Sequence, residues 1–120
     1  MYGKNTWLIA DGFMSDTECG GFVSHESICV LNLSGEEAHI TMTVYFEDAE
    51  PLRGLHASCA HERSHHIRLD KLVSEDGRKI PKNVPYSVLV ESDRPIAVQV
   101  SRLDVTQPEY TLMTTIPFSV

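Results

Sequence analysis

The sequence predicts one all-β domain, a single compact antiparallel β-sandwich of about eight short strands with little or no helix. Polar and apolar residues alternate at a spacing of two in several segments, and turn residues separate these segments at short intervals. Apolar residues do not recur at the three- and four-residue spacing of an amphipathic helix. Because 120 residues is the length of one ordinary domain, residues 1–120 are expected to form one fold.

The clearest predicted strand covers residues 38–46, where apolar side chains alternate with threonine, histidine and tyrosine. Residues 27–33 are apolar on both faces, as in a central strand, and the turn at 34–37 predicts an antiparallel hairpin over 25–46. A second hairpin is predicted to join residues 86–91 to 95–103 through 92–94. The remaining predicted strands are residues 7–10, 55–60, 65–69 and 112–118, and residues 73–85 are predicted to form a long loop.

Composition excludes several classes of protein. The chain has 10 Lys and Arg against 17 Asp and Glu, a net charge of −7, which disfavours binding to nucleic acid because phosphate contacts need a basic surface. Its hydrophobic content of 42% is too high for a disordered chain. No apolar run approaches the roughly 20 residues of a membrane-spanning helix, so a membrane span is not expected.

The cysteines and the N-terminus indicate a compartment. The apolar run at residues 7–10 is shorter than the ~7–15 residues of a secretory signal. The chain has three cysteines, Cys19, Cys29 and Cys59, and an odd number without an export signal favours reduced thiols. We therefore expect a cytoplasmic protein.

Arg102 interrupts a regular pattern. Ile96, Val98 and Val100 form the apolar face of one predicted strand, and Arg102 takes the next position on that face. Either a β-bulge redirects the strand, or the guanidinium points inward and must be paired or must face a ligand. Asp104 and Asp11 are candidate structural partners, and a contact with ligand is the other interpretation.

Trp7 and Asp11 are predicted to share one face of the first strand. Trp7, the only tryptophan, is either a core anchor or a platform on which a polar ligand stacks. The loop at residues 14–21 contains Gly20 and Gly21 and lies between two phenylalanines, so it is a candidate lid over a site.

Histidines cluster in the middle of the chain. Cys59, His61, His65 and His66 lie within eight residues and are in principle zinc ligands. Their spacing matches no standard zinc motif. The alternative interpretation is that a turn at residues 61–64, with solvated side chains, joins two strands. We therefore predict no metal site and no cofactor.

No catalytic motif is present. The sequence lacks a nucleophile elbow, a phosphate-binding glycine loop and a His-Glu-x-x-His motif. Asp11, His25 and Arg102 are residue types that carry out acid–base chemistry, but their spacing alone does not place them together. His25 and Glu26, just before a buried strand, form either a structural pair or the polar lining of a site. We predict that the protein is not an enzyme.

Several blocks, in order and spacing, resemble the Anabaena sensory rhodopsin transducer superfamily over nearly the whole chain. They include TWLIADGF (6–13), FVSHE (22–26), ICVLN (28–32), EEAH (36–39), TVYF (43–46), EP (50–51), RSHHIR (63–68), SDRPI (92–96), VSRLD (100–104) and MTTI (113–116). The early motif of the superfamily usually has glutamate before the glycine and a proline soon after. Here Asp11 replaces the glutamate and the proline is missing, which is expected to change the loop shape and the choice of ligand.

The resemblance implies an all-β sandwich that assembles as a symmetric homotetramer. It also implies a non-enzymatic module that binds or senses a small polar, sugar-like molecule. The alternative is a cytoplasmic signal transducer that docks on a sensory rhodopsin or another membrane receptor. Carried over by position, the ligand pocket comprises Trp7, Asp11, His25, Glu26, Arg63, His66, Arg102 and Asp104.

Overall fold

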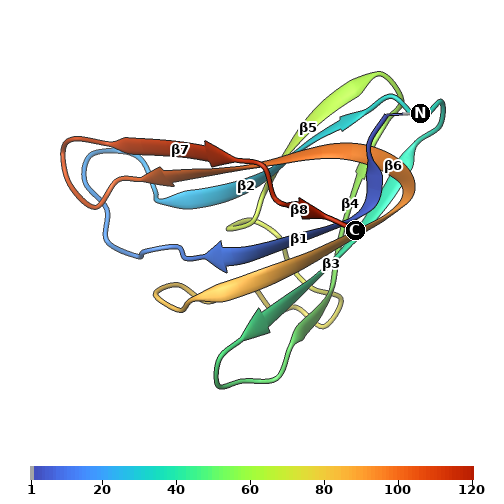
Figure 1. Cartoon of the computed structure of the whole chain (residues 1–120). Coiled ribbons are helices and arrows are strands. Elements are labelled where there is room, and N and C mark those ends of the chain that lie inside the picture. The colour runs from blue at the N-terminus through green and yellow to red at the C-terminus, as the bar shows by residue number, and fades with distance from the viewer. Residues whose placement is uncertain (1) are drawn as a thin grey trace.

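Eight antiparallel strands form the fold, which confirms the all-β prediction (Figure 1). A computed structural model describes residues 2–120, so Met1, the first residue of the predicted domain, lies outside the described residues. This part of the chain contains no helix, and therefore none long and apolar enough to cross a membrane. The strands are β1 (Lys4–Gly12), β2 (His25–Asn32), β3 (Ala38–Phe46), β4 (Leu52–Cys59), β5 (Arg63–Arg68), β6 (Tyr86–Asp104), β7 (Thr111–Thr115) and β8 (Phe118–Ser119).

The long strand β6 connects two halves of the sheet. The first part of β6 pairs with β1 on one side and β3 on the other, and β8 then pairs with β1 and β4 with β3. The second part of β6 pairs with β2 and β7, and β5 pairs with the other edge of β2. Figure 1 shows β6 bending sharply between these parts, so that the two halves lie over one another. At the bend the register shifts, because Thr6 lies opposite Glu91 whereas Lys4 lies opposite Ile96. This geometry places one core between the two halves.

The predicted hairpin of residues 86–91 and 95–103 is therefore wrong. Both segments are extended, but each pairs with other strands and not with its neighbour in the chain. Asp93, predicted to be in a turn, accepts a hydrogen bond from the His39 backbone nitrogen at 2.8 Å. Its other carboxylate oxygen lies 3.0 Å from Nδ1 of His39. These contacts attach the bend of β6 to β3. The two parts of β6 on either side of the bend then belong to different halves of the sheet.

The predicted hairpin over residues 25–46 is also wrong, because β2 pairs with β5 and β6 whereas β3 pairs with β4 and β6. Asn32, fully buried at the end of β2, explains the change of direction. Its side-chain amide donates to the carbonyl oxygens of Glu36 at 2.7 Å and Cys59 at 2.8 Å. The turn between β2 and β3 thus carries the chain from one half of the sheet to the other.

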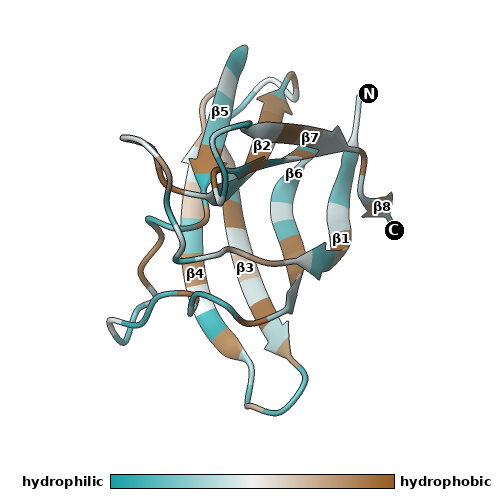
Figure 2. Ribbon diagram, turned by 90° about the vertical axis from the view of Figure 1, so that its left-hand side faces the viewer, coloured by the Kyte–Doolittle hydropathy of each residue, from teal (hydrophilic) through white to brown (hydrophobic). Residues whose placement is uncertain are grey.

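The core confirms the alternation that the sequence predicts for individual strands. Figure 2 shows hydrophobic and hydrophilic bands alternating along β3 and β4. Fully buried side chains from both halves form one cluster, which includes Ile28, Val30, Ile40, Met42, Val44, Leu55, Leu69, Val88, Val90 and Ile96. Apolar burial of this kind contributes roughly 1.5–3 kcal/mol for each large side chain, so this shared core holds the two halves together.

The structure corrects the predicted C-terminal strand and confirms the predicted long loop. The predicted strand at 112–118 is two strands, β7 and β8, because Pro117 lies between them and has no backbone N–H to donate. Residues 73–85 form no strand, which confirms the predicted loop. Within this loop Ile80 is buried in the core, so the segment is anchored to the sheet.

Replacing Gly12 with alanine is expected to destabilise the fold by about 1–3 kcal/mol. A Cβ atom at position 12 lies 2.3 Å from Cε1 of the buried Tyr86 ring, so the ring must move. Gly21→Ala is the matched control, because a Cβ there meets nothing within 4 Å. Urea denaturation of both variants measures the difference. Equal stability of the two variants contradicts the close packing of Tyr86 against β1.

Candidate functional site

A buried carboxylate, Glu26, organises the polar groups at one end of the two sheet halves. Glu26 lies on β2 directly opposite Arg102 on β6, and its exposed fraction is 2%. One carboxylate oxygen accepts from Nε of Arg102 at 2.6 Å. The other accepts from the Phe13 backbone nitrogen at 3.1 Å and from the hydroxyl of Tyr86. These four residues, Phe13, Glu26, Tyr86 and Arg102, are called the Glu26 centre below.

Electrostatics shift the pKa values of Tyr86 and Arg102 in the Glu26 centre. Burial and the negative charge of Glu26 both raise the pKa of Tyr86 far above its usual value, so the phenol keeps its proton and donates. Burial acts to lower the pKa of Arg102, but the carboxylates of Glu26 and Asp11 raise it overall. The result is a charged pair with a neutral hydroxyl donor.

The Glu26 centre satisfies its own hydrogen bonds. Arg102 also donates to the Asp11 carbonyl oxygen at 3.2 Å, and its guanidinium lies 3.5 Å from the Asp11 carboxylate. Within residues 2–120, every buried side-chain nitrogen and oxygen has a hydrogen-bond partner. Of the two interpretations of Arg102, the structure shows a pairing with carboxylates, and its main partner is Glu26. The centre therefore links β1, β2 and β6 and presents no unpaired buried polar group to a ligand.

Two further predicted site residues lie near the Glu26 centre but outside it. Asp104 lines a small hollow of about 140 Å³ together with Arg102, and its carboxylate accepts from the backbone nitrogen of Thr106 at 2.9 Å. A bond from the Thr106 hydroxyl lowers the pKa of Asp104. His25 is half-buried, with its Nδ1 3.0 Å from the Val23 carbonyl oxygen.

Trp7, His66 and Arg63 do not join that group. Trp7 is 8% exposed and packs in the core, the first of its two interpretations. It does not share a face with the exposed Asp11, because the register of β1 is irregular between Ile9 and Gly12. Trp7 and His66 both line a separate hollow of about 400 Å³. Arg63 is exposed and donates to the carbonyl oxygen of Glu62.

The histidine cluster lies where β4 ends and β5 begins. His61 accepts from the Gly35 backbone nitrogen at 3.1 Å, whereas Nδ1 of His65 lies 2.7 Å from the Ser58 carbonyl oxygen. Cys59 donates to the Arg63 carbonyl oxygen. No group of three His, Cys, Asp or Glu side chains among residues 2–120 is placed to hold a metal ion. The turn interpretation describes this segment, because β4 and β5 are separate strands joined through residues 60–62.

The candidate lid is attached at both ends. Met14 is 1% exposed, and its carbonyl oxygen accepts from the Asn83 backbone nitrogen at 2.8 Å. Near the other end, the Tyr110 hydroxyl donates to the Cys19 carbonyl oxygen. These contacts pack residues 14–21 against two other loops. A lid function for this segment stays a prediction.

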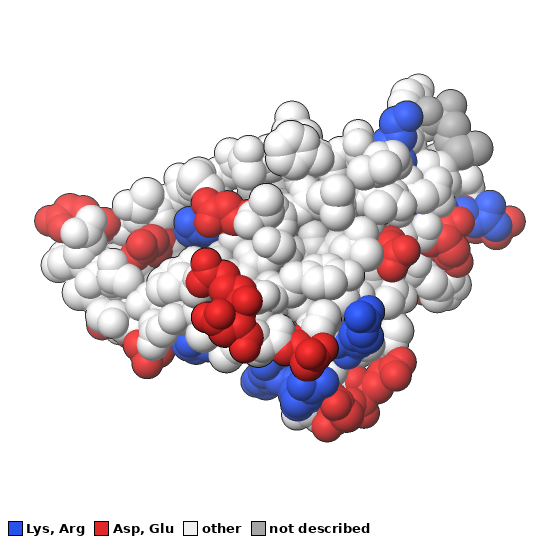
Figure 3. All heavy atoms as spheres, turned by 60° about the horizontal axis from the view of Figure 1, so that its bottom comes forward, with Lys and Arg blue, Asp and Glu red and all other residues white. Residues whose placement is uncertain are grey.

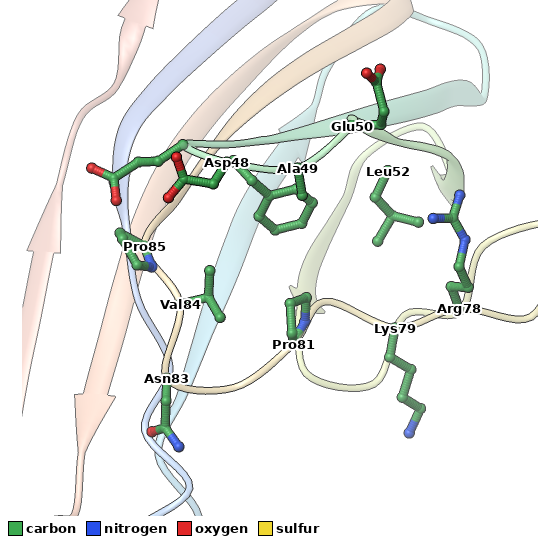
Figure 4. A pocket seen from close by; sticks show the side chains of 12 residues that line it. Asp48, Ala49, Glu50, Leu52, Arg78, Lys79, Pro81, Asn83, Val84 and Pro85 are labelled. Atoms are coloured by element: carbon green, nitrogen blue, oxygen red, sulfur yellow. The ribbon is translucent and has the colours of Figure 1, made fainter.

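A hollow larger than the two described above lies elsewhere, between the β3–β4 turn and the loop before β6. It has a volume of about 600 Å³, within the range of ligand sites. Figure 4 shows residues of these two segments facing each other across it. We call it the turn–loop cleft. Its apolar lining is Phe46, Ala49, Leu52, Pro81, Val84 and Pro85, and its polar lining is Glu47, Asp48, Glu50, Arg78, Lys79 and Asn83.

The loop wall of the turn–loop cleft is held in place by backbone contacts. The Ser74 backbone nitrogen donates to the Arg78 carbonyl oxygen at 2.7 Å, and the Arg78 backbone nitrogen returns a bond to the Ser74 hydroxyl at 2.9 Å. Glu75 donates through its backbone nitrogen to the Gly54 carbonyl oxygen on β4 at 3.1 Å. A wall fixed in this way is preorganised, which lowers the entropic cost of binding.

Some charged side chains around the cleft form ion pairs and others do not. Arg78 donates from Nε to both carboxylate oxygens of Asp76, at 3.0 and 3.2 Å. Within residues 2–120, Glu47, Asp48 and Glu50 form no ion pair. Figure 3 views the molecule with the lower side of Figure 1 brought forward and shows acidic and basic side chains in adjacent groups. Lys79 also lines the cleft and forms no ion pair in this part of the chain, so the cleft combines an apolar floor with three unpaired carboxylates and one unpaired ammonium group.

Sequence reasoning missed the turn–loop cleft completely. Its residues come from a turn and a loop, where no periodic pattern exists to be interrupted. The available signal was the acidic turn at 47–50 together with two prolines, Pro81 and Pro85, that flank an apolar Val84. Only the fold brings these two segments together.

Comparisons with known proteins agree with this fold. A family profile described as Anabaena sensory rhodopsin transducer matches residues 2–119. A solved structure titled Crystal Structure of Thermotoga maritima 1070 is 41% identical, with a TM-score of 0.89, covering 100% of this chain and 97% of that one. The solved Anabaena sensory rhodopsin transducer is 34% identical, with a TM-score of 0.76, covering 86% of this chain and 90% of that one. No curated protein matches the sequence.

Proposed function

The chain belongs to the Anabaena sensory rhodopsin transducer family, and from that premise we propose that it is a non-enzymatic module that binds and senses a small polar molecule. The observation that carries the proposal is the turn–loop cleft, which is large and partly apolar and has one wall built on an anchored loop. The Glu26 centre holds the two sheet halves together beside it. The cytoplasm is the proposed compartment, supported by three cysteines that are all free.

Sugar-like molecules are the proposed ligand class. Sugars bind where an apolar surface faces the C–H groups of the ring and nearby polar groups accept bonds from its hydroxyls. Phe46, Val84 and the cleft prolines supply the first element, and the unpaired carboxylates of the β3–β4 turn supply the second. Trp7 is 8% exposed and Arg102 is already paired with Glu26, so we propose the turn–loop cleft as the ligand site in preference to the pocket expected by resemblance.

Thermal unfolding with a panel of sugars and small metabolites tests the proposal. A ligand at ten times its Kd stabilises the native state by about 1.4 kcal/mol, which raises Tm by about 3–6 °C in a domain of this size. Val84→Trp is designed to fill the cleft and is expected to abolish the rise. Val73→Trp is the matched control, because Val73 is exposed and lies outside the cleft. A rise that persists in Val84→Trp rules out this cleft as the binding site.

A second candidate function is signal transfer by protein contact, with a sensory rhodopsin or another signalling protein as partner. Its support is the 34% identity to the Anabaena sensory rhodopsin transducer and the exposed apolar side chains of the C-terminal segment. Five apolar side chains of this segment are exposed, namely Leu112, Met113, Ile116, Phe118 and Val120. Exposed apolar patches of this kind mark interaction sites, and we propose that the same surface supports assembly into a homotetramer.

A further inference from the structure

We propose that the turn–loop cleft selects ligands that carry a protonated amino group next to a compact apolar face. The inference rests on the proposed function, because it specifies the chemistry of the molecule bound in that cleft. It is carried by three features of the cleft, which are its floor, its charge and the direction of its acidic side chains.

The floor determines which part of the ligand is apolar. Leu52 is buried at the start of β4, and Val84 and Phe46 are half-buried beside it. Water over such a surface is displaced favourably by a ligand with an apolar face. A fully hydrated, multiply charged ion has no such face and gains nothing from this floor.

The charge at the rim of the cleft determines the sign of the charge that a ligand must carry. The acidic turn contributes Glu47, Asp48 and Glu50, none of which has an internal cationic partner in the described part of the chain. On the opposite wall, the positive charge of Arg78 is already opposed by Asp76 at 3.0 Å, and Lys79 contributes one positive charge against the three carboxylates of the turn. The unbalanced charge at the cleft is therefore negative, which attracts a cation and repels a carboxylate or phosphate.

The directions of the side chains identify Asp48 as the contact for the amino group. Figure 4 shows the Asp48 carboxylate directed toward the side of the cleft that Val84 and Pro85 line. Glu50 and Lys79 extend away from the centre of the cleft in the same view. Asp48 thus accepts a charge-assisted hydrogen bond from an ammonium group while the rest of the ligand covers the floor.

Isothermal titration with matched probes tests the inference. The probes are glucosamine and phenethylamine, each compared with its N-acetylated form, which keeps the apolar face and removes the charge. We expect each amine to bind about tenfold more tightly than its acetylated partner. Asp48→Asn is expected to remove that difference, whereas Glu50→Gln, the control in the same turn, is expected to retain it. Added salt is expected to weaken only the amines.

The outcomes separate the two proposals. Equal or tighter binding of the acetylated probes, or a preference for amines that Asp48→Asn leaves intact, overturns the inference. If neutral sugars bind in the cleft and amines do not, the proposed function stands and the charge selection is wrong. If no probe of either charge binds, or if Val84→Trp binds every probe as well as the wild type does, the proposed function fails as well.

Discussion

Replacing Glu26 with alanine is expected to destabilise the fold by about 3–5 kcal/mol, the cost of removing one partner from a buried ion pair. The substitution leaves Arg102, which lies near the end of β6 between β2 and β7, without its closest carboxylate. It also leaves the hydroxyl of the buried Tyr86 and the backbone nitrogen of Phe13 without their acceptor. Urea denaturation followed by the fluorescence of Trp7 measures the change.

An exposed pair of the same kind is the control for that experiment. Glu36 accepts from Arg94, but both side chains are largely exposed, so Glu36→Ala is expected to cost at most about 1 kcal/mol. The contrast between the two glutamates isolates the contribution of burial. A loss below about 1 kcal/mol for Glu26→Ala would show that the Glu26 centre does not hold the sheet halves together.

The second large effect concerns Trp7. Trp7→Ala is expected to cost about 3–5 kcal/mol, because the side chain is 8% exposed and packs in the shared core. Its Nε1 donates to the Lys4 carbonyl oxygen at 3.1 Å, so the indole nitrogen is also satisfied inside the protein. Thermal denaturation followed by circular dichroism measures the loss, since the variant has no tryptophan to report it.

Leu8→Ala supplies the comparison for Trp7, because the neighbouring residue on β1 points outward and is 41% exposed. It is expected to cost less than about 1 kcal/mol. The opposite pattern, a stable Trp7→Ala variant that has lost only ligand binding, would restore the interpretation of Trp7 as a stacking platform and remove it from the core.

The fold class and most strand positions were predictable because they depend on local alternation. The pattern in residues 38–46 follows from the pleat of a single strand and needs no knowledge of its neighbours. Both hairpin predictions failed because strand pairing depends on contacts far apart in the sequence. Asn32 reaching Cys59 and Asp93 reaching His39 decide the pairing, and neither contact has a signature in a single sequence.

The candidate site was less predictable than the fold. Arg102 was found because it interrupts a periodic pattern, and the structure explains the interruption by its pair with Glu26. Its partner was harder to identify, since Glu26 is 76 residues away. The turn–loop cleft has no periodic context at all, so an unpaired Asp48 in a polar turn is indistinguishable from an ordinary solvated residue until the loop before β6 is placed opposite it.

The measurement that tests the central claim most directly is an amide NMR titration of the intact protein with glucosamine. If the turn–loop cleft is the binding site, saturable shifts are expected in residues 46–50 and 78–84, the two segments that face each other across it. The amides around Glu26 and Arg102 are expected to stay unchanged. Saturable shifts confined to the Glu26 centre or to the C-terminal apolar surface, with the cleft amides unmoved, would contradict the account.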